Sequence, residues 1–398
     1  MTLRTMVACA ATAFMTIPVT APVAHAESAP SSFTNSATTA SGRTPSGVRV
    51  TVRKTPIGTT QVASAESLPA SPSAPDDEYL VPDNAKTTAG FIDLYEHFAT
   101  EPRAWSDVAT LTFTFSRPVR DPHLHIFGTG GSSGDSEDRD DYWPAIELVS
   151  GTPAKPTFSQ VAGFPGYRTT TTSIEPEWMF SAESTTCGVV YTCGTVKVNG
   201  TVSAFTIKLK AHDARQGSGG ATPQLWAAFK LSLTEDGSDA PDSYGAASHA
   251  ITDSLLGQAV SADHTDAVSM TPRALATDTD GDDAVTVAQA RIVTDGRTCA
   301  LKIPVRAGSP SDVTGWIDFD HDGRFDPAER ATVQVAKSAT TAKLSWTIPQ
   351  PLRTGATWMR LRLTARAKAA VSPTGWADSG EVEDHRIQLV RQGAGARL

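Results

Sequence analysis

The sequence lacks most of the features by which an enzyme or a nucleic-acid-binding protein is recognised. Among 398 residues there are 4 cysteines and 7% aromatic residues, and 34 Lys and Arg stand against 43 Asp and Glu, which gives a net charge of -9. Such a chain lacks the basic face that nucleic acid or an anionic membrane requires. It contains no HExxH zinc helix and no glycine-rich phosphate loop followed by Lys-Ser/Thr. We therefore expect a protein that is not an enzyme and has neither of these partners.

Long apolar runs are also missing, except at the N-terminus. There Arg4 adds positive charge, residues 7–17 are apolar, and Ala24-His25-Ala26 is a small-x-small cleavage site. We predict that residues 1–26 are a signal peptide and that the mature, secreted chain begins at Glu27. Residues 391–398 carry neither a hydrophobic tail nor a sorting motif, so we expect release, or cell-wall association through another molecule.

Three cysteines follow the predicted signal peptide. Cys187 and Cys193 are spaced for a local disulfide across a tight turn, which an oxidising exterior would favour. Cys299 is left over. It is either a small buried residue at the start of a strand or part of a cross-domain bridge, and the bridge would require the other two to be mispaired.

Composition predicts an all-β protein with two β-sandwich domains after a disordered spacer. Residues 27–83 are rich in Ser, Thr, Ala and Pro and predict the spacer, in which only VRVTVR at 48–53 alternates like a strand. A first sandwich is predicted for residues 84–235 and a Gly/Asp/Ser-rich connector for 236–265. A second sandwich is predicted for residues 266–390, followed by the 391–398 tail.

Short runs with period-two alternation give the expected strands, and no stretch has the spacing of a long amphipathic helix. In the first domain these runs are residues 111–115, 123–127, 195–198, 202–209 and 225–233. In the second they are residues 298–306, 313–319, 331–335, 342–348, 357–364 and 385–390.

A candidate metal loop lies at residues 315–330, GWIDFDHDGRFDPAER. The pattern D-x-[DN]-x-[DN]-G-x5-E, typical of a calcium-binding loop, is filled by Asp318, Asp320, Asp322, Gly323 and Glu329. Alternate aspartates converge on one cation, the glycine permits a sharp turn, and the glutamate can add two oxygens. Arg324 would contribute its backbone carbonyl.

The flanks of this loop alternate like strands, so we expect a calcium ion held constantly between β-strands and not a helix-loop-helix sensor. Asp326-Pro327 reads as a helix start, which makes Asp326 either a cap or a ligand. The alternative for the whole stretch is a solvated acidic turn.

The second domain carries a family signature. Residues 373–384 read PTGWADSGEVED and follow TWMRLRLT at 357–364, while DAPDSYGAASH and LLGQAVSAD occur upstream. Over residues 239–390 these motifs resemble the GEVED domain of secreted and cell-surface bacterial proteins. The resemblance implies an extracellular β-sandwich that accompanies adhesive or catalytic partners. His385 departs from it, because an aromatic residue is usual there.

Carboxylates crowd this signature and an upstream run of aspartates. Like charges repel unless a cation lies between them. We therefore hypothesise a second calcium site that joins Glu381 or Glu383 to a loop containing Asp278, Asp280 and Asp282.

The first domain has a partial resemblance. Residues 109–131, ATLTFTFSRPVRDPHLHIFGTGG, are similar to a strand-turn-strand in the lectin-like non-repetitive domain of fibrillar surface adhesins of Gram-positive bacteria, and residues 91–95 match its opening strand. The resemblance implies binding of a glycan or glycoprotein.

Acidic residues beside aromatic residues are candidates for that ligand, because such groups contact sugar hydroxyls and faces. The candidates are Asp138, Asp140, Asp141, Tyr142 and Trp143, and the alternative is a solvated loop. His123 and His125 are either a ligand pair or ordinary surface or hydrogen-bonded histidines.

The sequence thus predicts a secreted, adhesin-like protein that binds a glycan or glycoprotein and has calcium as its cofactor. The alternative is a secreted carbohydrate-active or other hydrolase with an ancillary GEVED module, since a glycosidase needs only two suitably spaced carboxylates.

Overall fold

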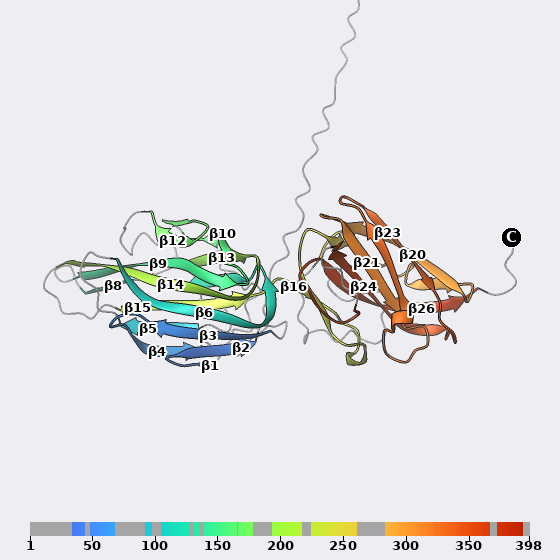
Figure 1. Ribbon diagram of the computed structural model, residues 1–398, viewed down its shortest axis with the longest axis horizontal. Coiled ribbons are helices and arrows are strands. Elements are labelled where there is room, and N and C mark those ends of the chain that lie inside the picture. The colour runs from blue at the N-terminus through green and yellow to red at the C-terminus, as the bar shows by residue number, and fades with distance from the viewer. Residues whose placement is uncertain are drawn as a thin grey trace, which may run out of the picture.

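The computed structural model describes residues 34–43, 48–67, 92–97, 105–127, 131–134, 139–164, 166–177, 193–216, 224–260, 283–366 and 372–392 (Figure 1). The predicted signal peptide, the partner Cys187 of the predicted disulfide, and Asp138, Asp278, Asp280 and Asp282 lie outside these ranges. For Asp140, Asp141, Tyr142 and Cys193, only the backbone strand is described.

The first domain consists of two sheets. The nine-stranded sheet has the order β1 (Thr34–Asn35), β2 (Thr39–Arg43), β3 (Arg49–Pro56), β6 (Trp105–Arg120), β14 (Thr201–Gln216), β9 (Arg139–Thr152), β12 (Ser173–Pro176) and β11 (Tyr167–Thr169), and β8 (Gly131–Gly134) pairs with β9. The six-stranded sheet has the order β10 (Thr157–Gly163), β13 (Cys193–Asn199), β7 (His123–Phe127), β15 (Gln224–Ser232), β5 (Ile92–His97) and β4 (Gln61–Ser67).

The core of this domain lies between the two sheets. Phe113 and Phe205 stack with ring centroids 4.7 Å apart on the nine-stranded sheet. They belong to one buried cluster with Leu124, Val196 and Phe229 of the other sheet. Alternation along each strand buries one face of each sheet, so two sheets together close a core that neither could close alone. The predicted all-β sandwich is confirmed.

The predicted spacer is wrong for residues 34–43 and 48–67, which form β1 to β4. In β3 the side chains alternate, with Val50 and Val52 buried and Thr51 exposed. Val52 pairs with Phe113 of β6, and the strand expected at 48–53 is confirmed. The tract has few apolar residues, but they fall on one face, and β6 supplies the large side chains that cover them. An average over composition cannot detect this arrangement.

The second domain has three layers of strands. Its five-stranded sheet has the order β19 (Arg291–Thr294), β26 (Glu381–Arg391), β24 (Gly355–Ala365), β21 (Ser311–Ile317) and β22 (Arg330–Val335). One face packs on β18 (Leu255–Leu256), β20 (Thr298–Arg306) and β23 (Thr341–Thr347). The small sheet β16 (Glu235–Gly237), β17 (Ala247–Ala250) and β25 (Gly375–Ala377) contacts the same domain through β26.

Two tryptophans of the second domain are buried in different clusters. Trp346 joins the main cluster and donates its indole N–H to the carbonyl of Gly315 at 3.1 Å. Trp316 packs instead with Tyr244 and Phe325. Cys299 is a buried free thiol in the main cluster, and burial raises its pKa to about 12, which agrees with the interpretation as a small apolar residue.

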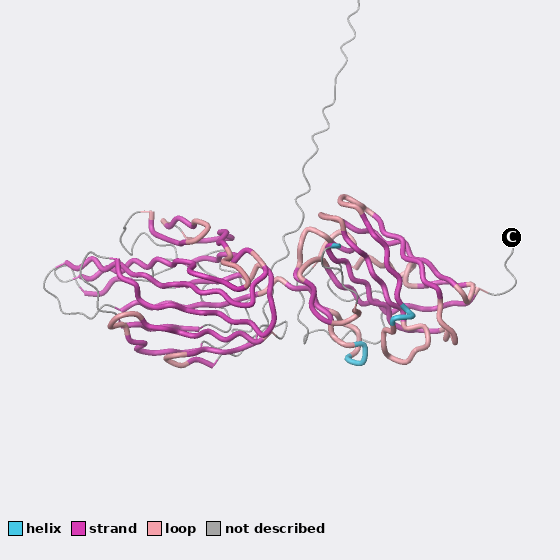
Figure 2. Tube along the Cα trace, viewed as in Figure 1, coloured by secondary structure: helices cyan, strands magenta, loops and turns pink. Residues whose placement is uncertain are grey.

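The predicted connector belongs largely to the second domain. Residues 235–256 contain β16, β17, β18 and the 3-10 helix η3 (Asp242–Tyr244). Figure 2 shows that strands dominate the trace and that short helical turns occur in the second domain. These turns include η3 and η4 (Pro327–Glu329). The composition resembles a linker because Asp, Ser and Gly form caps and turns here, but the amides of Ala240 and Leu256 and the carboxylate of Asp236 bond to β26. No helical turn in the described ranges is long and apolar enough to cross a membrane.

The two domains meet through arginines at the end of β6. Arg117 donates to both carboxylate oxygens of Glu235, at 2.9 and 2.6 Å, and lies over the Trp376 ring at 5.0 Å. Arg120 donates to the carbonyl of Asp378 at 2.8 Å. These contacts connect the end of β6 to β16, which contains Glu235, and to β25, which contains Trp376 and is followed by Asp378.

Candidate functional site

The aspartate loop lies where β21 ends, between the core and solvent. Oxygen atoms of Asp318, Asp320 and Asp322 all lie within 4.8 Å of one another. Asp318 is fully buried, Asp320 is half-buried and Asp322 is exposed. The structure therefore brings together the first three predicted calcium ligands.

Backbone hydrogen bonds fix the shape of this loop. The amide of Asp322 donates to Asp318 Oδ1 and to Asp320 Oδ1, each at 3.2 Å, and the amide of Gly323 donates to Asp318 Oδ2 at 3.1 Å. Gly323 has φ +82°, a conformation that side-chain-bearing residues rarely adopt. The glycine of the pattern is thus required by the turn that directs the carboxylates inward.

Glu329 stands apart from the three aspartates. Its Oε1 accepts from the amide of Phe319 at 2.7 Å and its Oε2 from the amide of Asp326 at 2.9 Å, the second bond being half of a capping box on η4. Burial, in the field of Asp318 and Asp320, raises the pKa of Glu329 to about 7. Asp326 is the N-cap of η4, and Arg324 donates its amide to Asp322 Oδ1 at 2.9 Å.

Tyr244 is a partner of this loop that the motif did not reveal. Its hydroxyl donates to Asp318 Oδ2 at 2.6 Å, and its ring lies 4.6 Å from that of Phe325. Burial, followed by the hydrogen bond to Asp318, raises the pKa of Tyr244 far above its ordinary value. The tyrosine stood in a motif assigned to the connector, and only the fold places it beside the aspartates.

The GEVED signature fastens residues 235–256 to the last strand. Asp384 Oδ2 accepts from the amide of Ala240 at 2.7 Å, and the amide of Val382 donates to Asp236 Oδ2 at 2.5 Å. Glu381 accepts from the amide of Leu256. A Cβ on Gly380 would lie 1.8 Å from the carbonyl of Leu363, so only glycine fits there.

Two arginines opposite the core face of β24 are buried by these same elements. Arg360 forms a bidentate ion pair with Asp384, with nitrogen–oxygen distances of 2.7 and 2.8 Å, and both side chains are fully buried. Arg362 donates to His249 Nε2 at 2.8 Å, while His249 Nδ1 donates to the carbonyl of Ser379 at 2.7 Å. Burial and the adjacent Arg362 lower the pKa of His249 well below its usual value.

The candidate second metal site is described only on one side. Glu383 accepts from the amide of Ala284 at 3.0 and 3.2 Å and from His385 Nε2 at 2.9 Å. His385 Nδ1 lies 3.3 Å from Asp283. Burial opposes the charged ring, but hydrogen bonds to Asp283 and Glu383 raise the pKa of His385 to about 10. Its departure from the family pattern therefore places an imidazole ring between two carboxylates.

In the first domain, the histidine pair has an ordinary structural environment. His125 is fully buried, and its Nδ1 lies 2.9 Å from the hydroxyl of Thr195. Among the five predicted ligand residues, only Trp143 has a described side chain. It is 6% exposed and packs edge-on to His212.

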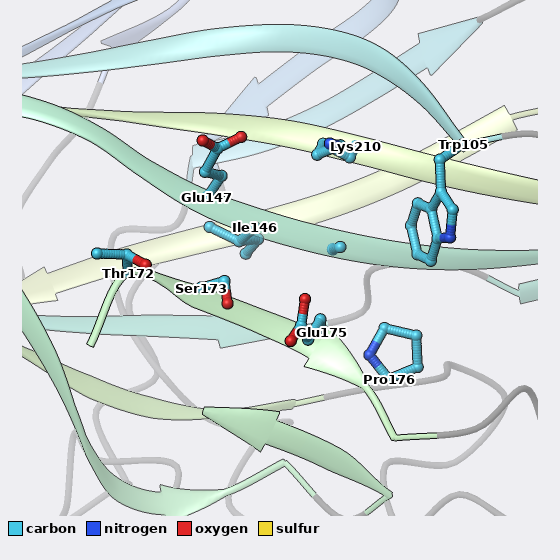
Figure 3. Close-up of a pocket in the computed structure, with 9 residues that line it drawn as sticks. Trp105, Ile146, Glu147, Thr172, Ser173, Glu175, Pro176 and Lys210 are labelled. Carbon is cyan, nitrogen blue, oxygen red and sulfur yellow. The ribbon is translucent and has the colours of Figure 1, made fainter. Parts of the chain in front are cut away.

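The first domain also has a groove, of about 510 Å³, that sequence reasoning missed (Figure 3). It crosses β6, β14, β9 and β12, which are neighbours in the nine-stranded sheet. Its lining includes Trp105, Glu147, Thr172, Ser173, Glu175 and Lys210. Residues so distant in sequence gave no local motif by which to find it.

Comparison with known proteins supports the second-domain resemblance. Residues 312–388 match the GEVED domain family, which confirms that prediction. No curated protein matches the chain. Among solved structures, the adhesin domain of Epf from Streptococcus pyogenes aligns with 88% of this chain and 94% of its own, at 8% identity and a TM-score of 0.22. A score this low supports no conclusion about fold or function.

Proposed function

We propose that this chain is a secreted, adhesin-like binding protein. Its first domain recognises an extracellular glycan or glycoprotein, and its second domain is a calcium-stabilised accessory module. The observation that carries the proposal is how the second domain uses its buried charges: Arg360 on β24 pairs with Asp384 on β26, and Glu383 pairs with His385 within β26. Groups committed in this way stabilise a scaffold and are not free to act on a substrate.

Recognition is therefore assigned to the first domain, where an open groove presents polar and aromatic side chains to solvent. Secretion rests on the signal-peptide pattern of residues 1–26. We do not assign an enzymatic activity.

The donor set of the aspartate loop fits calcium. Calcium prefers carboxylate and carbonyl oxygens, and Asp318, Asp320 and Asp322 supply carboxylates that would repel one another without a cation. A bound ion would neutralise this charge and tie the end of β21 to the turn before β22. Glu329 would first have to exchange a backbone hydrogen bond, and the carbonyl of Arg324 remains a proposed ligand.

A second calcium site at Glu381 and Glu383 also remains a proposal. Glu381 accepts the amide of Leu256 and Glu383 accepts the amide of Ala284, so a bound ion would share oxygens that already hold the last strand in place. Calorimetric titration of the mature chain with calcium would count the ions bound.

The function is tested with the mature chain, residues 27–398, in millimolar calcium. The purified protein is applied to an array of glycans and glycoproteins, and the same sample is assayed for released sugars and peptides. We expect retained binding without product. Product release without retained binding would overturn the proposal in favour of a hydrolase, and no binding to any glycan or glycoprotein would also overturn it.

A further inference from the structure

The groove of the first domain has the features of a carbohydrate site, beginning with its tryptophan. Trp105 is 40% exposed, although most large apolar side chains of this domain are buried. Its ring packs edge-on to His212 with centroids 5.5 Å apart, and His212 packs on Trp143 at 5.9 Å. Because His212 holds the Trp105 indole in place before a ligand arrives, less side-chain entropy is lost on binding.

The polar groups around Trp105 are held in place by ion pairs. Lys208 Nζ lies 3.1 Å from Glu147 and 3.1 Å from Asp107, and Arg168 lies 2.5 Å from Glu175. Hydrogen bonds to Glu147 and Asp107 raise the pKa of Lys208. These pairs fix the carboxylates in place, and the remaining lone pairs of their oxygens can accept hydrogen bonds from ligand hydroxyls.

The balance of charge indicates the class of ligand. Each carboxylate of Glu147, Glu175 and Asp107 has a cationic neighbour, so the groove presents no strong field of either sign. Thr172 and Ser173 add hydroxyl groups, and the volume of about 510 Å³ lies within the range of roughly 300–1,000 Å³ common for small-ligand sites. An apolar ring face beside hydrogen-bonding groups of both kinds matches an uncharged sugar ring, with its C–H face and its hydroxyls.

The two glutamates resemble a glycosidase pair in position but not in environment. Glu147 pairs across the strands with Ser173, so Glu175 is its diagonal neighbour on the same face. The Cα atoms of such neighbours lie about 7–8 Å apart. Their carboxyl groups can therefore reach the separations of roughly 5–9.5 Å that glycosidases use. A general acid, however, needs a raised pKa, usually from burial. Glu147 and Glu175 are 43% and 39% exposed, so neither has the buried environment of a general acid.

We propose that this groove binds an uncharged glycan chain without cleaving it. Trp105 provides the stacking surface, and Glu147 and Glu175 accept hydrogen bonds from sugar hydroxyls. This inference rests on the proposed function and specifies both the site and the class of glycan.

The test uses the mature chain in affinity gel electrophoresis with embedded neutral polysaccharides, namely a glucan, a mannan and a galactan, and with an acidic polyuronate. We expect retardation by at least one neutral polymer. Trp105→Ala should weaken that binding at least about tenfold, and Glu175→Gln by about threefold to tenfold. Val161→Ala is the matched control, because Val161 is equally exposed but lies on β10 of the other sheet.

Each outcome bears on a different statement. Binding that survives both Trp105→Ala and Glu175→Gln would overturn the groove as the site and leave the proposed function intact. Binding to the polyuronate alone would overturn the class of glycan, and release of reducing sugar would overturn binding without cleavage. If Trp105→Ala lowers the melting temperature, its loss of binding could come from unfolding. The binding of Glu175→Gln then decides whether the groove is the site, because Glu175 is exposed and its substitution should not unfold the domain. Absence of binding here and on the array would overturn the proposed function itself.

Discussion

At the scale of single residues, the aspartate loop is where the sequence is most specific. Its pattern predicts convergence of alternate carboxylates, and Asp318, Asp320 and Asp322 do converge. It also predicts that Glu329 joins them, whereas Glu329 caps the next turn. The same glutamate can satisfy either arrangement, and the pattern does not distinguish them.

We predict that calcium raises the melting temperature of the second domain and that Asp320→Ala abolishes this increase. An ion that binds only the folded state at 100 times its dissociation constant adds about 2.7 kcal/mol to the free energy of unfolding. Scanning calorimetry with calcium or with chelator measures the increment. Asp295→Asn removes an acidic turn residue elsewhere in the domain and should keep the increment. Equal melting temperatures for the wild type in both buffers would identify a solvated acidic turn.

His249 is predicted to make stability depend on pH. Its pKa in the folded state is lowered below the ordinary value of 6.5 by burial and by Arg362, with Arg360 adding to the effect. The unfolded chain therefore binds the proton more readily, so the free energy of unfolding is greatest above about pH 6.5 and falls as pH decreases. Asp236 is paired with it across β16 and β17, and the hydrogen bond to the carbonyl of Ser379 lessens the lowering of the pKa without cancelling it.

The measurement is urea unfolding of the wild type and His249→Gln between pH 5 and pH 8. Glu329, whose raised pKa gives the opposite slope, is common to both proteins, so the difference between them isolates the histidine. The wild type should lose its advantage over the variant as pH falls. A difference that does not vary with pH would contradict a neutral buried His249.

At the scale of elements, β24 shows what alternation can and cannot reveal. The period-two pattern correctly places Met359, Leu361 and Leu363 on the core face. It leaves Arg360 and Arg362 on the other face, which would ordinarily be solvated. Both are buried, because Asp384 and backbone carbonyls of residues 372–375 surround them. A fully paired buried arginine is tolerated, but its partners come from other strands.

We predict that β3 is essential for the first domain. Val52→Asp places a charge in a position that is 0% exposed and should cost about 3–5 kcal/mol, enough to unfold a marginal domain. Thr51→Asp, its exposed neighbour on the same strand, should change stability by less than about 1 kcal/mol. Calorimetry and limited proteolysis report the outcome. If both variants melt like the wild type, residues 48–67 act as a spacer after all.

At the scale of the whole molecule, Arg117 connects the two domains. It pairs with Glu235, whose side chain is only 3% exposed, and lies over Trp376. Removal of the cation would leave a buried carboxylate without its partner. The junction should therefore transmit stability from one domain to the other.

We predict that Arg117→Ala lowers the free energy of unfolding by about 1–3 kcal/mol and separates the calorimetric transitions of the two domains. The control is Arg168→Ala, which breaks an exposed pair with Glu175 and should cost less than about 1 kcal/mol. Unchanged, superimposed transitions in Arg117→Ala would show that this contact does not couple the domains.

The sequence by itself determined the local elements, because backbone periodicity and turn chemistry act between near neighbours. Runs 123–127 and 298–306 are strands with the predicted bounds, the aspartate turn has the predicted glycine, and the GEVED signature was recognisable. Only the tertiary structure decided what covers each face. It put residues 34–43 and 48–67 into the two sheets of the first domain, tied residues 235–256 to the last strand, and gathered Trp105, Glu147 and Glu175 into one groove. The reason is physical: strand order and burial depend on partners that are tens of residues distant, and no local pattern specifies them.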